Sequence, residues 1–407
     1  MKRIAIIGAG ASGMFLANLL TDKNVEAQVF ETEEKPLKKL LASGNGRCNF
    51  TNTKLNLSNY YGKDKALTEN ILKKFDNFSV ISFFEKMGMP SKDLESGRVY
   101  PSTFSSKTVF SVMNERLGEN IKIKPGTKIE NIVKNKDEYK LTDSRGNAYN
   151  FDIVILAMGG IRNVKNEFIN SKEILKCLGH SQTKMFPGIV QISTFGNFSK
   201  MKNQKFTAKV DIIQKNEVLR TYVGDTLFTD YGISGLSILQ LSNDIMYALQ
   251  NGEVFLKLDI LHETRFENVK KFIYEIRERK PKIEVEKAFE GYVHREIIEY
   301  ILDELGISRR LYLYKLRDSE IESIIKKLKE FIIKVKGAKS DKDGQITLGG
   351  VPLTEVNIET LESILVPNIY FTGEILDVQG ESGGYNLQWA FSSAYAVYSD
   401  IKNRYMI

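Results

Sequence analysis

Three glycines close to the N-terminus, Gly8, Gly10 and Gly13, have the Gly-x-Gly-x-x-Gly spacing of a dinucleotide-binding turn. They follow an apolar run at residues 4–7 and open a helical pattern. In this context glycines let the backbone approach a pyrophosphate, and free helix N–H groups attract its charge. A second strand pattern at residues 27–30 ends in Glu31, where a carboxylate meets ribose hydroxyls and disfavours a 2′-phosphate. The segment predicts FAD or NAD, bound by Gly8, Gly10, Ala11, Ser12, Gly13 and Glu31.

A second constellation lies near the other end of the chain. Residues 369–377 predict a strand, a glycine turn and two acids, and residues 380–390 predict a glycine-rich entry into a last helix. A flavin uses such parts, because a carboxylate or amide holds the ribityl hydroxyls and a positive helix end stabilises the anionic reduced ring. NAD enzymes do not require this element, so FAD is favoured over NAD. The alternative is structural: a ligand-free glycine turn and a glycine-capped terminal helix.

The whole chain resembles the BaiN/YhiN-like flavoproteins, a family that includes proteins named as aminoacetone oxidases and bile-acid enone reductases. Its most specific motif is Ser-Gly-Asn-Gly-Arg-Cys-Asn-x-Thr-Asn, here at residues 43–52. The resemblance implies an α/β fold: a Rossmann-like two-dinucleotide-binding FAD domain with an inserted β-barrel-like module and a helical module. The segments that carry it are residues 8–13, 42–52, 97–101, 227–235, 349–352 and 373–389.

The resemblance also implies cofactor contacts beyond the glycine turn. The loop at residues 39–52 wraps FAD, with Arg47, Cys48 and Asn49 nearest the flavin, and the backbone of Lys128 meets the adenine. The other residues that the resemblance places at non-covalently bound FAD are Lys39, Gly46, Ala157, Met158, Gly159, Gly373, Glu374, Asp377, Gly384, Tyr385, Asn386 and Leu387.

Three positions or segments depart from the family pattern. Met158 stands where threonine is usual, residues 161–168 replace a loop with Ser/Tyr-Pro and glycines, and Asp230 replaces a histidine. The last two fall near the expected substrate side or interdomain cleft. The family therefore predicts the substrate of this chain less well than it predicts FAD.

Periodicity divides the chain into three parts. Strand and helix patterns alternate in residues 1–188, and with residues 345–407 these predict a discontinuous FAD-binding domain. Residues 189–260, with about 336–345, have strand-like patterns and polar turns and predict a β-rich insert. Residues 261–335 repeat apolar residues at helical spacing and predict a packed helical insert.

Composition argues against nucleic-acid-binding, disulfide-rich, metal-binding and membrane proteins. The formal charge of +7 comes from 58 basic and 51 acidic residues without a block of like charge, which argues against a nucleic-acid partner. Two cysteines, Cys48 and Cys177, and three scattered histidines form neither a disulfide framework nor a metal site, which suits a reducing cytoplasm. Cys48 is expected as a packed thiol and His180 as a packed or capping histidine. The first residues could mimic a signal peptide, but glycines interrupt their short apolar run, so none is expected, and no apolar stretch reaches membrane-spanning length.

These features predict a cytoplasmic FAD-dependent oxidoreductase that passes hydride between a small organic substrate and the flavin. By resemblance the reaction is amine or aminoketone oxidation or enone reduction, with the substrate held between the FAD domain and the β-rich insert. No second Gly-x-Gly-x-x-Gly occurs, so NAD(P)H is expected only as a transient electron donor. The catalytic residue is unknown, with Tyr385, Asp230 and Tyr231 as candidates by position.

Two alternative functions stay open. One is a flavin-dependent RNA-modifying enzyme whose lysine-rich helical insert docks RNA. The other is a non-catalytic, flavin-bound sensor or partner protein. The oligomeric state is also left open.

Overall fold

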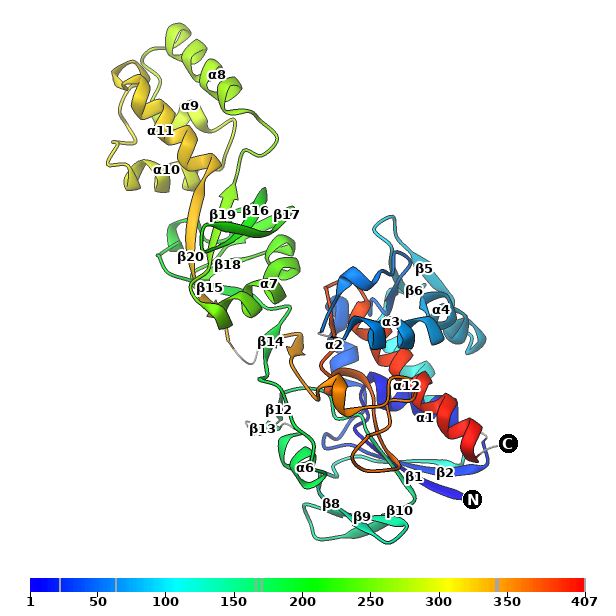
Figure 1. Ribbon diagram of the computed structural model, residues 1–407. Helices are drawn as coiled ribbons and strands as arrows, with labels where there is room; N and C mark the ends of the chain where they lie inside the picture. The colour runs from blue at the N-terminus through cyan, green and yellow to red at the C-terminus, as the bar shows by residue number, and fades with distance from the viewer. Residues whose placement is uncertain (22, 63, 165–166, 170, 341–343, 406–407) are drawn as a thin grey trace. The chain divides into compact units, whose positions relative to one another are not determined.

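Figure 1 shows the computed structural model, which describes residues 1–21, 23–62, 64–164, 167–169, 171–340 and 344–405. The chain divides into two units. Unit 1 comprises Met1–Phe186 and Gln345–Ile407, and unit 2 comprises Pro187–Gly344. Unit 1 is therefore built from both ends of the chain, with unit 2 inserted between them.

A five-stranded parallel sheet forms the centre of unit 1. Its order is β22 (Ile369–Phe371), β11 (Ile153–Leu156), β1 (Lys2–Ile7), β2 (Val25–Phe30) and β7 (Ile121–Lys124). Ile4 and Ile6 in β1 are fully buried, because a central strand of a parallel sheet is covered on both faces. The predicted α/β, Rossmann-like fold is confirmed.

Helices from the two ends of the chain pack together in unit 1. α1 (Ala11–Leu20) lies against α12 (Tyr385–Tyr405), and the rings of Phe15 and Phe391 are 4.7 Å apart between centroids. The indole N–H of Trp389 donates to the carbonyl oxygen of Gly373 at 3.1 Å. The core of unit 1 therefore needs the N-terminal and C-terminal segments together.

Smaller sheets and helices complete unit 1. The antiparallel sheets join β8 (Ile129–Asn135), β9 (Glu138–Asp143) and β10 (Ala148–Phe151); β3 (Thr51–Asn52), β6 (Arg98–Pro101) and β5 (Ser91–Asp93); β4 (Tyr60–Tyr61) and β23 (Gln379–Gly380); and β12 (Arg162–Val164) and β13 (Glu167–Ile169). The helices are α2 (Lys38–Gly46), α3 (Lys65–Lys74), α4 (Asn77–Lys86), α5 (Ser106–Glu115) and α6 (Lys172–Cys177), with short 3-10 turns η1 (Leu57–Asn59), η5 (Leu353–Glu355) and η6 (Gly373–Ile375).

Six strands of unit 2 close into a barrel. Their order is β15 (Ile192–Thr194), β18 (Gly232–Ser234), β17 (Glu217–Phe228), β16 (Lys205–Gln214), β19 (Phe255–Asp259) and β20 (Phe331–Ala338). Val210, Leu256 and Ile333 on these strands are buried, as expected for a small barrel whose interior is filled by side chains. α7 (Leu236–Ala248) packs against β17, and β14 (Phe186–Gly188) and β21 (Ile346–Leu348) lie where the chain passes between the units.

The other part of unit 2 is helical, and we call it the helical module. Its helices are α8 (Phe266–Arg279), α9 (Val285–Phe289), α10 (Arg295–Glu304) and α11 (Asp318–Lys329), and its 3-10 turn is η4 (Leu313–Lys315), while η2 (Ser199–Met201) and η3 (Leu249–Asn251) belong to the barrel part. Ile273, Ile298 and Ile325 lie on three of the helices and are fully buried, so the apolar stripe forms a core as predicted.

The helical expectation for residues 331–335 is wrong. α11 ends at Lys329, and the next residues form β20, which pairs with β15 and β19. Phe331 continues the apolar spacing of α11, so periodicity alone extends the helix too far. Phe331, Ile333 and Val335 are buried and alternate with more exposed residues, which is the pattern of a strand with one face on the barrel interior.

Within the described ranges, no helix is long and apolar enough to cross a membrane. Those ranges also contain no cluster of three or more His, Cys, Asp or Glu side chains placed to hold a metal ion.

Candidate functional site

The glycine turn between β1 and α1 uses its three glycines in different ways. A methyl group on Gly8, whose φ is +111°, would lie 2.3 Å from the Ala157 carbonyl oxygen. One on Gly13 would lie 2.0 Å from the Gly8 carbonyl oxygen. Both positions therefore need glycine for packing. A methyl group on Gly10 would meet no atom within 4 Å, so the backbone there faces open space, as a pyrophosphate requires.

The first turn of α1 supplies N–H groups beside this space. Gly10 caps the helix without a side-chain hydrogen bond, and the first helical bond runs from the Met14 N–H to the Gly10 carbonyl. The N–H groups of Ala11, Ser12 and Gly13 thus have no partner four residues earlier within the helix. Phosphate oxygens fit such a helix start.

Glu31 directly follows β2 and is buried against the glycine turn. Its Oε2 accepts from the Ala9 N–H at 2.8 Å, and its Oε1 accepts from the Glu33 N–H at 3.0 Å. The Thr127 N–H donates to the Glu31 carbonyl at 2.7 Å, which places the next residue, Lys128, beside the same strand end. The Lys128 carbonyl accepts from Ser144, so its predicted adenine contact stays a prediction.

The C-terminal glycine turn packs on the first turn of α1. A methyl group on Gly373 would lie 2.5 Å from Ser12 Oγ. The neighbouring Glu374 carboxylate accepts from Lys39 Nζ at 2.9 Å and from the Thr347 N–H at 2.6 Å. Gly159, at the end of the predicted Ala157–Gly159 stretch, lies close to the same carboxylate. Predicted contacts from four separate segments are therefore brought together, including Ala157 and Met158, which border Gly8.

Hydrogen bonds join the end of the motif at residues 43–52 to the start of α12. Asn52 Nδ2 donates to the Gly383 carbonyl at 2.9 Å, and the Thr51 hydroxyl bonds the Gln388 amide oxygen. A methyl group on Gly384 would lie 2.5 Å from the Thr51 carbonyl oxygen. Thr51 and Asn52 are the last two residues of the motif, and no cofactor contact was predicted for them. Their place in the motif was the sequence feature that could have indicated a structural role.

Asn49 supplies a buried acceptor beside the start of α12. Its Oδ1 has no hydrogen-bond partner among the described residues, and it would lie 3.0 Å from a methyl group on Gly384. The Gln388 N–H bonds the Gly384 carbonyl, so the N–H groups of Tyr385, Asn386 and Leu387 come before the first helical bond. A ligand that offers one donor to Asn49 and carries negative charge at the helix end fits both features.

Two further predicted contacts, like Glu31, Lys39 and Glu374 above, have side chains that bond to other parts of the protein. Asn386 closes the glycine loop, because its Oδ1 accepts from the Gly380 N–H at 2.8 Å and its Nδ2 donates to the Gly380 carbonyl at 2.9 Å. Asp377 accepts from the Thr183 hydroxyl at 3.1 Å. Cofactor contacts by these two residues remain predictions.

Arg47 and Cys48, neighbours in the motif loop, differ sharply in environment. The Cys48 thiol is fully buried, and burial raises its pKa to about 12, so it stays protonated and packed. Arg47 is exposed, and its guanidinium has no ion-pair or hydrogen-bond partner in the part of the chain that the structure describes. Gly46 beside it has a φ of +76° and open space above it.

The three candidates for a proton donor are now distinguishable. Asp230 pairs with Lys202 at 2.7 Å, and hydrogen bonding to that lysine lowers the pKa of Asp230, so the carboxylate stays ionised. The Tyr231 hydroxyl donates to Gln191. The Tyr385 ring is buried at the start of α12, but its hydroxyl has no hydrogen-bond partner among the described residues, and burial raises its pKa. Tyr385 alone offers an unused, protonated hydroxyl.

The departure at residues 161–168 is partly described. Strands β12 and β13 pair antiparallel, and the Ile161 N–H donates to the Thr347 hydroxyl at 3.0 Å. Lys165 and Asn166 lie outside the described residues.

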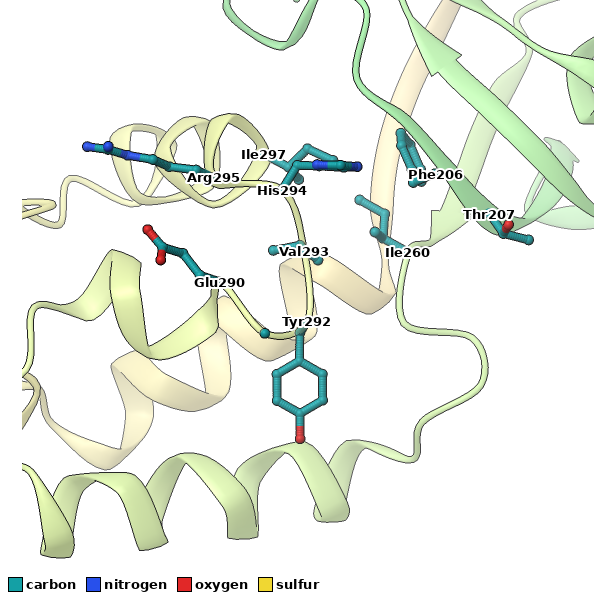
Figure 2. A pocket seen from close by; sticks show the side chains of 10 residues that line it. Phe206, Thr207, Ile260, Glu290, Tyr292, Val293, His294, Arg295 and Ile297 are labelled. Atoms are coloured by element: carbon teal, nitrogen blue, oxygen red, sulfur yellow. The ribbon is translucent and has the colours of Figure 1, made fainter.

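Figure 2 shows a pocket of about 450 Å³ within unit 2. The rings of Phe206 and Tyr292 and the polar groups of Glu290, His294 and Arg295 are among its lining. The imidazole lies 3.0 Å from a backbone carbonyl oxygen, and the guanidinium pairs with two carboxylates. None of the predicted cofactor contacts lines this pocket, so it is not assigned to the cofactor.

The residues present in unit 1 fit FAD. The open face of Gly10, the N–H groups of α1 and Glu31 suit its pyrophosphate and ribose, and Asn49 and the start of α12 suit its ring. The fold and this site define a Rossmann-type, flavin-dependent oxidoreductase. The family profile described as "HI0933-like protein Rossmann domain" matches residues 2–399, and the chain belongs to this HI0933-like family. The predicted family is thus confirmed.

Relatives with assigned reactions match the chain over nearly its whole length. It is 31% identical over 401 residues to a 3-dehydro-bile acid delta(4,6)-reductase of Clostridium scindens, covering 97% of this chain and 98% of that protein. It is 26% identical to a ribosomal RNA dihydrouridine synthase of Escherichia coli, covering 97% of this chain and 97% of that protein. It is also 26% identical to a ribosomal RNA dihydrouridine synthase of Haemophilus influenzae, covering 96% of each chain.

Proposed function

We propose that the protein is an FAD-dependent reductase of a carbon–carbon double bond conjugated to a carbonyl group. The observation that carries the proposal is the relative named as a 3-dehydro-bile acid delta(4,6)-reductase, which aligns over almost all of both chains. A 3-dehydro-delta(4,6) group is a ketone conjugated to double bonds. Enone reduction is also one of the reactions expected from the family resemblance, and the named reductase favours it over amine or aminoketone oxidation.

The other named relatives support the same bond change. Making dihydrouridine adds two hydrogens across the C5–C6 double bond of uracil, which is conjugated to a carbonyl. In either substrate one carbon receives hydride and its neighbour receives a proton, and the carbonyl takes up the developing negative charge. The shared element is therefore the conjugated double bond, and the rest of the substrate differs.

Residues of unit 1 suit this reaction in three ways. When bound, reduced FAD supplies the hydride. The start of α12 stabilises negative charge, and the buried acceptor of Asn49 orients a donor there. The unused Tyr385 hydroxyl is the proton source we assign to the second carbon. NAD(P)H, docked transiently, restores the reduced cofactor in this proposal.

A small organic enone is the first candidate substrate. The second candidate is a uridine in ribosomal RNA, favoured by the two relatives named as dihydrouridine synthases.

Anaerobic stopped-flow spectroscopy tests the reaction. The flavin is first reduced with NADH or NADPH and then mixed with a 3-oxo-delta(4,6) steroid, a simple enone, an unconjugated alkene or ribosomal RNA. We expect an enone or the RNA to restore oxidised-flavin absorbance and to gain two hydrogens by mass spectrometry, and the alkene to do neither. Purified protein that neither contains nor takes up FAD overturns the proposal, as does reduced flavin that no conjugated substrate oxidises.

A further inference from the structure

Two segments of the helical module, distant in sequence, run side by side. The Leu313 N–H donates to the Ile283 carbonyl at 2.8 Å, and the Tyr314 N–H donates to the Pro281 carbonyl at 3.1 Å. An antiparallel bridge joins Glu284 to Tyr312. The chain that leaves α8 is thereby held against the chain that approaches α11 (Figure 1).

This pairing presents two tyrosine rings to solvent. Tyr312 is 42% exposed and Tyr314 is 49% exposed, whereas Leu313 between them is fully buried. The alternation is that of extended backbone, in which a buried residue anchors the segment and its neighbours face away. The two rings lie within 17° of parallel, with centroids 6.2 Å apart. Backbone hydrogen bonds hold the segment that carries both rings, and among the described residues neither hydroxyl has a hydrogen-bond partner.

Unpaired cations lie on the two paired segments, one of which carries these rings. The exposed side chains of Arg279, Lys280, Lys282, Arg310 and Lys315 have no carboxylate within ion-pair distance in the described part of the chain. Lys315 Nζ lies 5.8 Å from the centre of the Tyr314 ring. The neighbouring acids in these segments are Glu278 and Glu284. Glu284 Oε2 forms an ion pair with Lys287 Nζ at 2.7 Å.

Cations elsewhere in the helical module are mostly neutralised. Ion pairs of 2.6 to 3.0 Å hold Lys270, Arg277, Arg295, Arg309 and Lys327 to carboxylates. Positive charge without a partner therefore gathers where the two exposed rings are. Three of these cations, Arg279, Lys280 and Lys282, are already neighbours in the sequence, and the fold adds Arg310, Lys315 and the two rings from a second segment.

We propose that this surface, the tyrosine–cation patch formed by Arg279, Lys280, Lys282, Arg310, Tyr312, Tyr314 and Lys315, binds single-stranded RNA. Unstacked bases stack on exposed aromatic rings, and unpaired lysines and arginines neutralise the phosphates between them. An acidic protein segment or an anionic membrane would use the cations, but neither places a planar group beside every negative charge as successive nucleotides do. The proposal revises the sequence expectation about nucleic acid and does not depend on the reduction proposed above.

Fluorescence anisotropy with a labelled, single-stranded oligouridylate tests the patch on the FAD-loaded protein across a series of salt concentrations. We expect the double variant Tyr312→Ala/Tyr314→Ala to bind about tenfold or more weakly, since each stacked base contributes. Lys280→Gln/Lys282→Gln should lower the slope of log K against log salt concentration by about 1.4, because each phosphate contact on a single strand contributes roughly 0.7 to that slope.

Matched controls come from the same helical module. Lys326→Gln removes an exposed, unpaired lysine of α11, and Phe272→Ala removes an exposed ring of α8, so both should leave RNA affinity unchanged. Thermal unfolding and flavin content, equal to those of the unmodified protein, establish that the patch variants are folded. Enone reduction by the patch variants, expected to be unchanged, separates this inference from the proposed reaction.

Several outcomes overturn the inference. These are no affinity for the oligouridylate, equal affinity in the double tyrosine variant, equal loss in the control variants, and equal affinity for the matching deoxyoligonucleotide. Binding to anionic vesicles or to an acidic peptide without binding to RNA assigns the patch to another partner and also overturns it.

Discussion

The side-chain amide of Asn52 donates a 2.9 Å hydrogen bond to the carbonyl oxygen of Gly383, although 331 residues separate the two in sequence. Its Oδ1 accepts from the Lys54 N–H, also at 2.9 Å. One side chain therefore holds both the end of the Ser-Gly-Asn-Gly-Arg-Cys-Asn-x-Thr-Asn motif and the glycine loop that leads into α12. The last residue of the motif acts on the helix start, and through it on the space for the flavin.

Asn52→Ala should loosen the cofactor. The substitution leaves the Gly383 carbonyl and the Lys54 N–H without their partner, so we expect a free energy of unfolding lower by about 1–3 kcal/mol and weaker FAD retention. Flavin content after dialysis and calorimetric unfolding measure both. Asn70→Ala removes exposed hydrogen bonds to Ile358 and Glu359 and should change neither. Unchanged FAD retention in Asn52→Ala would contradict the assigned role.

Gly10→Ala and Gly13→Ala should separate cofactor binding from folding. Gly10 has a φ of −77°, which alanine adopts, and open space for a methyl group. We expect its variant to fold normally without FAD but to bind FAD about tenfold or more weakly, equivalent to about 1.4 kcal/mol. Gly13→Ala forces a methyl group against backbone and should destabilise the apoprotein by about 1–3 kcal/mol. Unfolding of both apoproteins and FAD titration give the comparison, and equal effects on folding would contradict it.

The sequence predicts the pyrophosphate end of the site better than the flavin end. Gly8, Gly10, Gly13 and Glu31 lie in one contiguous strand–turn–helix–strand segment, whose local pattern fixes their geometry. Asp377 was assigned from its position in a motif, yet its carboxylate accepts from Thr183, 194 residues away. No local period reveals a partner at that separation, so the motif located the segment but not the use of each side chain.

Tyr385→Phe should slow reduction of the substrate without slowing reduction of the flavin. The change removes the hydroxyl assigned as proton donor and keeps the buried ring. General acid catalysis contributes about a hundredfold or more, so we expect a comparable loss in flavin reoxidation by an enone. Stopped-flow measurement of the two half-reactions checks this. Tyr231→Phe, the matched control, should leave both half-reactions intact. Equal rates in the Tyr385 variant and the unmodified protein would assign the proton to another donor.

His180 is enclosed in a polar cluster, in agreement with the prediction of a packed histidine. Its Nδ1 lies 2.8 Å from Glu355 Oε2, and its Nε2 lies 2.7 Å from Ser363 Oγ. Ser363 Oγ also accepts from two backbone N–H groups, those of Leu365 and Val366. Its hydroxyl hydrogen therefore points to the imidazole, which accepts it in the neutral form.

Stability should fall in mild acid because of this cluster. Burial, opposed by Glu355, holds the pKa of His180 below its ordinary value, so the unfolded chain binds a proton near pH 6.5 that the folded protein does not. The free energy of unfolding should decrease below that pH, by at most about 1.4 kcal/mol per pH unit from this group. Urea unfolding between about pH 5 and pH 7 measures the slope.

The variant His180→Asn should lose this part of the slope, while His294→Asn, at an exposed position, should retain it. Glu355 contributes at lower pH. Burial tends to raise its pKa, but hydrogen bonds from Ser181 and His180 outweigh burial and hold it below its ordinary value. Its stabilisation is present above that ordinary value and is lost as the pH falls through the lower one. An identical slope in both histidine variants would contradict the role of His180.

Periodicity also has a limit in unit 2. The helical spacing of apolar residues located the buried stripes of the helical module. The same spacing continues from Leu328 in α11 to Phe331 in β20, so it predicted a helix where a strand begins. The tyrosine–cation patch was only partly visible in the sequence. Residues 279–282 are a short basic run, but their pairing with the segment of Tyr312 and Tyr314 depends on backbone hydrogen bonds that composition does not reveal.

The interleaving of unit 1 with unit 2 sets the order in which the protein is assembled on the ribosome. β11 is complete before unit 2 is synthesised, but its partner β22 and the helix α12 emerge only afterwards. During that interval Val154, Ile155 and Leu156 belong to an apolar strand with one unpaired edge, the condition in which nascent chains aggregate. Unit 2 is continuous in sequence, so all of its residues are synthesised before the last residues of unit 1. Unit 2 can therefore complete its fold while the sheet of unit 1 is still open at β11, and the nucleotide-binding fold closes last.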